Sequence, residues 1–212
     1  MLADQRAKIA ARKAELQKTL PEWEAALQKQ LENEPPSAVT FHPLEVLETT
    51  TQASETPLTR QADGSYLVGG QNPATNVYTL TAKVPVTGLT GIRLDVLADD
   101  RLPANGPGRA KHGNFVLSEI RLFTDDSQSL QHPKRVELTG AMADFAQKGF
   151  DPKLALRLQD DPTKGWAISP EFGKDHWAIF TTAKPIESTG GVTFLEIQMD
   201  HPNAGELILI AE

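Results

Sequence analysis

The residues best suited to recognising a ligand lie in one glycine-containing stretch, GPGRAKHGN, at residues 106–114. This stretch contains Arg109, His112 and Asn114, and Arg101 lies a few residues before it. Guanidinium, imidazole and amide groups are planar, so they can hydrogen-bond neighbouring sugar hydroxyl groups in pairs. A basic loop would also suit sulfated or uronic-acid polysaccharides, because a guanidinium pairs with two anionic oxygens. These four residues are therefore candidates for a ligand site.

A sugar site also needs an aromatic ring that stacks on the apolar face of a pyranose. Trp177 follows His176 at the entry to an apolar run, and both are candidates for the site. The sequence leaves open whether Trp177 faces the core or the solvent. Trp166, Tyr66 and Tyr78 lie within strand-like runs, and we expect them to pack in the core.

The basic loop also has a purely structural interpretation. Arg109 can brace the loop by bonding backbone carbonyls, or by pairing with Asp99 or Asp100. Asn114 can be a turn residue, because asparagine tolerates a left-handed backbone. Both interpretations are consistent with the sequence.

A calcium ion is the metal that the sequence favours. The segments LADDRLPANG and LQDDPT offer carboxylates and backbone carbonyls, which are ligands that suit this hard cation. Asp99 and Asp100 are the candidate ligands of a structural calcium ion. Neither segment has EF-hand spacing, and the alternative is that these residues, like Asp160 and Asp161, are solvated turn residues.

Sequence motifs for catalysis are missing. The chain has no cysteine, which excludes thiolate–zinc sites, cysteine nucleophiles and haem attachment through CxxCH. Its five histidines form no HxxxH or HxH pair, and GxSxG and GxxxxGK[ST] do not occur. The 28 acidic residues are too many for a glycosidase pair to be located. We therefore expect a protein that is not an enzyme, with calcium as the only candidate cofactor.

The net charge and the hydropathy of the chain limit the classes of partner that we expect. A net charge of −7 argues against binding along a nucleic-acid backbone. No apolar stretch approaches the length of a transmembrane helix, so we expect no membrane span. The opening MLADQRAKIAARKAEL lacks the apolar core of a signal peptide, so an export signal would have to lie outside this segment.

Beyond residue 37 the pattern is that of strands. In GIRLDVLA, Ile92, Leu94 and Val96 alternate with charged residues, as in a half-buried strand. The other candidate strands are VTFHPLEVL, SYLVGG, NVYTLTAKV, NFVLSEIRLF, RVELTGAMADFA, GWAIS, HWAIFTT, GVTFLEIQMD and ELILIAE, and only FDPKLALRLQDD suggests a short helix. Many strands without intervening helices predict an all-β, jelly-roll-like β-sandwich over residues 38–212.

Residues 1–37 form a separate helical lead-in, in which Ala, Leu, Glu, Lys, Gln and Arg dominate. Leu2, Ile9, Leu16 and Trp23 recur every seven residues and predict an apolar stripe on a helix. The stripe either packs on a following or neighbouring domain, or forms a self-associating coiled coil.

The lead-in is expected to consist of two helical pieces, at about 3–18 and 20–33. Thr19 and Glu22 fit a capping box at the start of the second piece. Pro21 is tolerated in a first helical turn and would break or kink a continuous helix.

Four ordered strings resemble a β-sandwich segment of large planctomycete-type proteins that join a c-type cytochrome domain to two uncharacterised domains. The strings are ADDRLPANGPGRAKHGNFVLSEIRLF, ADFAQKGF, GWAISPEFGKDHWAIF and FLEIQMDHPNAGELIL, and the lead-in LPEWEAALQKQ resembles the stretch before that sandwich. The chain departs from the pattern at His112, where asparagine is usual, and in the closing GELILI, which replaces an aromatic strand. The resemblance implies one module of a longer exported protein, with flanking domains as partners.

The string GPGRAKHGNFVLSEI is also similar to galactose-binding-like sandwiches of the discoidin type. Such domains commonly act as carbohydrate-binding modules, and many hold a structural calcium ion. The resemblance therefore implies non-catalytic binding of a polysaccharide through loops at one end of the sandwich. The alternative is a structural module that packs on flanking domains and binds no ligand of its own.

Overall fold

The computed structural model divides into two compact units, Met1–Thr40 and Phe41–Glu212. It describes residues 5–6, 8–9, 12–13, 16, 18–21, 39–84, 86–125, 127, 130–157, 161, 163–188, 193–201 and 206–211, with the backbone alone described from residue 200 onward.

In the first unit, the described residues between 5 and 21 are helical. Ile9 and Leu16 of the apolar stripe are exposed to 69% and 53%. The capping box is wrong at Thr19, because its hydroxyl donates to the carbonyl of Leu16 at 3.1 Å inside the helix. Residues 18–21 are helical, and Pro21 lies within this helical segment. Leu2, Trp23 and the rest of the second helical piece lie outside the described residues.

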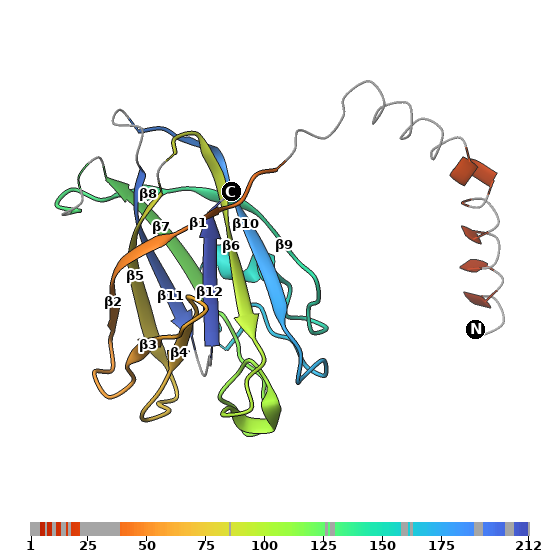
Figure 1. The fold of residues 1–212 in the computed structure, drawn as a ribbon. Helices are drawn as coiled ribbons and strands as arrows, with labels where there is room; N and C mark the ends of the chain where they lie inside the picture. Colours follow the sequence, from red (N-terminus) through yellow and green to blue (C-terminus); the bar gives the residue numbers. More distant parts are fainter. Residues whose placement is uncertain are drawn as a thin grey trace. The chain divides into compact units, whose positions relative to one another are not determined.

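The second unit is a β-sandwich of two antiparallel sheets (Figure 1). The seven-stranded sheet has the order β3-β4-β12-β6-β10-β9, and β1 pairs with the far end of β12. Its strands are β1 (His42–Pro43), β3 (Leu58–Arg60), β4 (Tyr66–Val68), β6 (Leu89–Leu97), β9 (Leu138–Ala143), β10 (His176–Ile186) and β12 (Glu206–Ala211).

The five-stranded sheet has the order β2-β5-β11-β7-β8. Its strands are β2 (Glu45–Thr51), β5 (Asn76–Val84), β7 (Glu119–Asp125), β8 (Lys134–Val136) and β11 (Thr193–His201). The chain changes sheet at each step from β4 to β7 and again from β10 to β12. The row β4-β12-β6-β10 therefore faces β5-β11-β7-β8, which is the strand order of a jelly roll. The all-β sandwich is confirmed.

The core fills the space between the sheets with inward-facing side chains from both. Ile92, Leu94 and Val96 have no exposed surface, which confirms the alternation predicted for this strand. Trp166, also fully buried, meets the ring of Phe115 edge-on with the centroids 5.0 Å apart, and its indole N–H donates to the carbonyl of Phe145 at 2.9 Å. Its core position and those of Tyr66 and Tyr78 are confirmed.

One predicted strand differs in the structure, and the predicted short helix is present. GWAIS is not a strand, because Trp166 makes only an isolated bridge with Leu117. FDPKLALRLQDD contributes a short 3-10 helix, η2 (Pro152–Leu156), capped by the carboxylate of Asp151. A second 3-10 turn, η1 (Pro103–Asn105), follows β6.

Candidate functional site

The loop that follows η1 is shaped by close approaches of its own backbone. A Cβ atom on Gly108 would lie 2.0 Å from the carbonyl oxygen of Asn114, and one on Gly106 would lie 2.6 Å from the Cα of Gly113. Gly113 itself has a φ of 84°, in the left-handed region that favours glycine. The glycines of GPGRAKHG are therefore explained by the way the loop crosses itself.

Arg109 braces this loop against the segment that follows β4. Its Nη1 and Nη2 donate to the carbonyls of Gln71 and Gly70 at 2.8 and 2.6 Å, and Asn72 Nδ2 donates to the Arg109 carbonyl at 3.0 Å. Burial raises the pKa of the Tyr78 hydroxyl, and the charge of Arg109 opposes that effect. Of the two interpretations of Arg109, these contacts favour the structural one, in which its side chain braces the loop.

Asn114 and His176 are turned into the protein. Asn114 is 8% exposed. Its side-chain Nδ2 donates to Gln147 Oε1, and its side-chain Oδ1 accepts from the backbone N–H of Ile168. His176 is 1% exposed and has an oxygen within 2.7 Å of each ring nitrogen. The expected direct contact with a glycan is therefore not supported for either residue, because their polar groups bond within the fold. Asn114 is also absent from the described residues that have a left-handed backbone.

His112 is exposed at the tip of the same loop. Its ring packs edge-on against Phe172, with the centroids 5.4 Å apart. This contact brings the loop beside the segment that precedes β10, which carries the groups described next.

β6 ends and β10 begins at the same end of the sandwich (Figure 1). A polar pocket of about 500 Å³ lies there, and we call it the end pocket. Its lining comes from the turn between β3 and β4, from the end of β6 and the segment after it, and from the residue before β10; it consists of Gln61, Ala62, Asp63, Leu97, Ala98, Asp99, Arg101 and Asp175. Of the residues expected from the sequence, only Arg101 and Asp99 are brought together here.

Hydrogen bonds fix the polar side chains of the end pocket. Arg101 pairs with both carboxylate oxygens of Asp99 and donates from Nη1 to Gln61 Oε1 at 3.0 Å. Asp175 Oδ1 accepts from the backbone N–H of Ala98 at 2.8 Å. The backbone N–H and hydroxyl of Ser65 donate to Asp63 and hold the pKa of this carboxyl below its usual value.

These pairings bear on the calcium ion expected at Asp99 and Asp100. Asp99 is engaged by a guanidinium, and Asp100 lies exposed in the turn beside it. Over the described ranges, no group of three or more His, Cys, Asp or Glu side chains could hold a metal ion. Asp161 accepts from Thr163, as a turn residue does, and Asp160 lies outside the described residues. The contacts favour the turn interpretation.

An aromatic strip runs from the end pocket along the outer face of the seven-stranded sheet. Trp177 is half-buried, two residues after Asp175, and opposite Asp95 of β6. The guanidinium of Arg93 lies 5.2 Å from the Trp177 ring centroid and 5.6 Å from that of Phe41. We call this surface the β6–β10 strip and define it by Phe41, Arg93, Asp95, Met142, Trp177 and Ile179.

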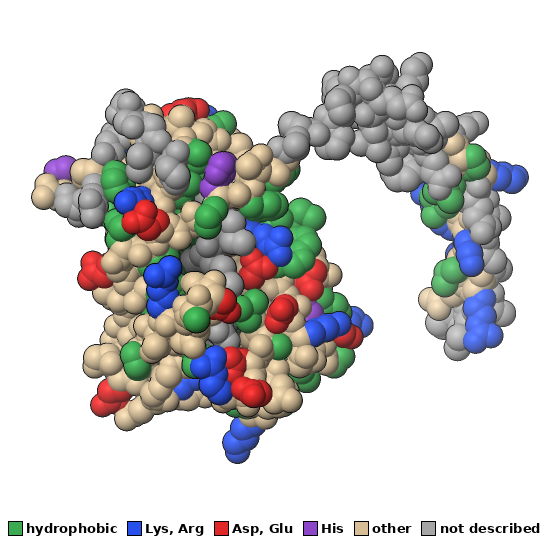
Figure 2. Space-filling model, in the orientation of Figure 1, with side chains coloured by type: hydrophobic (Ala, Val, Ile, Leu, Met, Phe, Trp, Pro, Cys, Tyr) green, Lys and Arg blue, Asp and Glu red, His purple; other side chains and the backbone are tan. Residues whose placement is uncertain are grey.

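Polar and apolar groups alternate along the strip. Arg93 donates from Nε and Nη2 to Asp95 Oδ1 at 3.1 and 2.6 Å, which fixes the guanidinium in the stack. Figure 2 shows hydrophobic side chains gathered over β9 and β10 beside a basic and an acidic side chain; Met142 of β9 is 56% exposed. The end pocket adjoins the β6–β10 strip along the chain: β6 ends at Leu97, which lines the pocket, and Asp175 of the pocket lies two residues before Trp177.

Five of these residues escaped the sequence analysis: Gln61, Asp63, Asp175, Arg93 and Phe41. The antiparallel register of β6 with β10, in which His176 pairs with Val96, brings Arg93 near Trp177. The pairing of other strands places the β3–β4 turn, with Gln61 and Asp63, beside Arg101. Charge alternation in GIRLDVLA was the one available signal, since it marks Arg93 and Asp95 as outward-facing.

Searches with protein-family models and among curated proteins found no match to the chain. No helix within the described residues is long and apolar enough to cross a membrane.

Proposed function

We propose that this protein is a non-catalytic carbohydrate-binding module that holds a polysaccharide in the end pocket and along the β6–β10 strip. The observation that carries the proposal is a half-exposed tryptophan that lies two residues along the chain from Asp175, which lines a polar pocket. Trp177 offers an indole edge or face for stacking on a sugar ring. Two residues away, Asp175 and its neighbours Gln61 and Arg101 offer planar groups for hydroxyl hydrogen bonds.

The charge of the end pocket bears on the class of glycan. Three carboxylates, from Asp63, Asp99 and Asp175, line it together with the one guanidinium of Arg101. That guanidinium is already paired with Asp99, and Arg109 is held by backbone carbonyls. We therefore expect a neutral polysaccharide, in place of the sulfated or uronic-acid chain that the basic loop suggested.

The sequence resemblance supports the same proposal from another direction. A module of the planctomycete-type, cytochrome-linked proteins with a galactose-binding-like sandwich would work inside a longer exported chain, where it would present that chain to polysaccharide. Jelly-roll sandwiches host many functions, so this support is an analogy at the level of the fold.

The second candidate is an interdomain module that binds no ligand. It is favoured by exposed apolar side chains near the entry to the sandwich: Phe41 is 37% exposed and Met142 is 56% exposed. In this case a flanking domain of the parent chain would cover the β6–β10 strip, and the strip would contribute to stability only in the longer protein.

Affinity electrophoresis tests the proposal. Gels containing a neutral β-glucan, a xylan, a galactan or dextran sulfate would be compared with a plain gel. We expect retardation by a neutral polysaccharide, weakened about tenfold in W177A, because one stacking contact contributes about 1 to 1.5 kcal/mol. R101A should weaken it less. K83A, which removes an exposed positive charge from the five-stranded sheet, is the matched control and should bind like the wild type.

Two results would contradict the proposal. Mobility that no polysaccharide changes would reject a sugar-binding role. Retardation that W177A and R101A leave intact would reject this site.

A further inference from the structure

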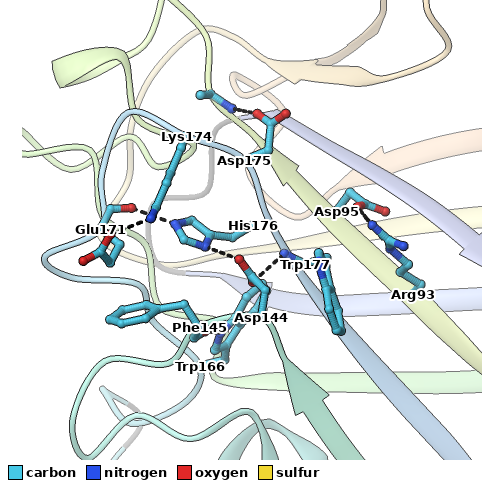
Figure 3. A network of polar contacts seen from close by, with 11 residues as sticks. Arg93, Asp95, Asp144, Phe145, Trp166, Glu171, Lys174, Asp175, His176 and Trp177 are labelled. Atoms are coloured by element: carbon cyan, nitrogen blue, oxygen red, sulfur yellow. Dashed lines mark hydrogen bonds and ion pairs between the residues drawn. The ribbon is translucent and has the colours of Figure 1, made fainter.

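His176, the first residue of β10, joins two oxygen atoms that lie on different segments of the chain. Its Nδ1 lies 2.7 Å from Asp144 Oδ2, just past β9, and its Nε2 lies 2.7 Å from the carbonyl oxygen of Glu171 (Figure 3). The side chain of His176 is completely buried, and that of Asp144 is 28% exposed. Both contacts are short enough to be hydrogen bonds.

The number of protons in this arrangement is set by its geometry. A backbone carbonyl can only accept, so Nε2 must carry a proton. An ionised carboxylate can also only accept, so Nδ1 must carry a second proton or Asp144 must be protonated. A neutral imidazole beside an ionised Asp144 would place a lone pair against an oxygen at 2.7 Å. The pair therefore holds one proton more than a neutral histidine and a free carboxylate would.

The same pair is bonded to both parts of the ligand site. Asp144 Oδ1 accepts from the backbone N–H of Trp177 at 2.9 Å, and the Asp144 N–H donates to the Trp177 carbonyl at 3.1 Å. On the other side, His176 secures the segment 171–175, which delivers Asp175 to the end pocket. Asp144 and His176 thus connect the position of Trp177 with that of the pocket wall.

Few charges face this pair from the elements packed on it. The segment 171–175 contributes Glu171 and Lys174, which pair at 2.5 Å. The end of β9 contributes Asp144 itself, followed by the ring of Phe145 at 5.9 Å from the His176 ring. On β6, the register partner of His176 is Val96, which is apolar and buried.

We propose that the proton shared by Asp144 and His176 is a pH switch that holds the segment 171–175 and Trp177 in the arrangement the ligand site requires. Below the transition the pair is protonated and the arrangement is stable. When a rise in pH removes this proton, one of the two contacts becomes repulsive, because two acceptors then face each other. The consequence for ligand affinity rests on the proposed function; the consequence for Trp177 does not.

Asp144→Asn is the decisive variant, because it keeps every hydrogen bond without the extra proton. The new amide nitrogen donates to Nδ1 of a neutral His176, whose Nε2–H still donates to Glu171. The amide oxygen still accepts from the Trp177 N–H. D144N should therefore fold normally and behave the same on both sides of the transition. H132Q, at an exposed histidine that precedes β8, controls for general histidine titration.

The first measurement needs no ligand. Long-range ¹H–¹⁵N spectra should show two protonated nitrogens on His176 at pH 5.5 in the wild type and one in D144N. The ¹⁹F signal of 5-fluorotryptophan at Trp177, assigned with W177F, should move as His176 loses its proton. This movement should be absent in D144N and present in H132Q. A singly protonated ring in the wild type at pH 5.5, or a Trp177 signal that does not follow the pH, would overturn the switch.

The second measurement is the affinity for whichever neutral polysaccharide retards the protein in the gel assay. Wild type and H132Q should lose about tenfold in affinity between pH 5.5 and 8.5, corresponding to one lost hydrogen bond, and D144N should lose less than twofold. If no polysaccharide binds at any pH while the spectra change as expected, the proposed function fails and the switch stands. If binding occurs but is equally strong at both pH values, its link to the ligand site is wrong.

Discussion

Two neighbouring segments at one end of the sandwich, 103–114 and 171–177, hold their polar side chains in opposite ways. In the first, Arg109 and Asn114 bond to carbonyls and amides of the protein. In the second, Asp175 and Trp177 are supported from behind by internal bonds and still reach the end pocket and the outer sheet face. The first segment uses its side chains to join loops, and the second presents them at the surface.

The difference shows that a binding site depends on where the internal partners of its residues lie. Arg109 donates to two backbone carbonyls, so these donors are used within the fold. Backbone groups of Trp177 meet Asp144, which leaves its indole ring outside that contact. Substitutions test this difference, because some remove a side chain that holds the loops together and others remove one that reaches the end pocket.

Gly108→Ala should have the largest effect. Its Cβ would lie 2.0 Å from the Asn114 carbonyl oxygen, so the loop would have to move, at a cost of about 3 kcal/mol or more in the free energy of unfolding. Urea denaturation measures it. G64A is the matched control: Gly64 has a φ of 92° and open space around it, so only backbone strain of about 1 kcal/mol is expected. Equal losses in the two variants would show that the close approach is not what the loop requires.

Arg109→Ala against Arg101→Ala is the next comparison. R109A leaves the carbonyls of Gly70 and Gln71 without their guanidinium donor and should destabilise the fold by about 1 to 2 kcal/mol. R101A removes an exposed pair with Asp99 and should cost less than about 1 kcal/mol. Thermal unfolding separates the two. A larger loss of stability in R101A than in R109A would reverse the roles assigned to the two loops.

The smallest effect concerns acid stability at the rim of the end pocket. The Ser65 hydrogen bonds hold the pKa of Asp63 below its usual value, so the folded state favours its ionised form. This contribution is present at neutral pH and is lost as the pH falls through the lowered pKa. In urea denaturation between pH 2.5 and 6, D63N should therefore lose slightly less stability on acidification than the wild type. Parallel pH profiles would show that Asp63 contributes nothing of this kind.

Much of the sandwich could be predicted from the sequence, because its strands carry their burial pattern locally. β5 has the predicted bounds, and side chains alternate along it between buried and half-buried. The burial of Glu119 could not be predicted from the local sequence pattern. Its place between Ser118 and Ile120 suggests an outward-facing residue, yet it is 6% exposed and pairs with Arg135 of β8 at 3.1 Å. That partner is set by strand pairing, which a single sequence does not reveal.

The candidate site was less predictable for the same reason. The sequence singled out a contiguous loop, whereas the end pocket draws on residues as distant as Gln61 and Asp175. The sequence analysis placed His176 and Trp177 in the same candidate site. In the structure, successive side chains of β10 point to opposite faces, so His176 points inward and Trp177 points outward.

The central place of β12 in the seven-stranded sheet has a consequence for folding during synthesis. This strand pairs with β6 along its length and with β4 and β1 at its two ends, although it is the last described strand in the chain. The sheet therefore cannot be completed until this strand has left the ribosome, and until then the flanks of β6 and β4 that pair with it lack their partner. Most native pairings join distant parts of the chain, which slows folding and leaves unpaired edges open to aggregation. A nascent chain stopped before residue 206 should accordingly need a chaperone where the full-length chain does not.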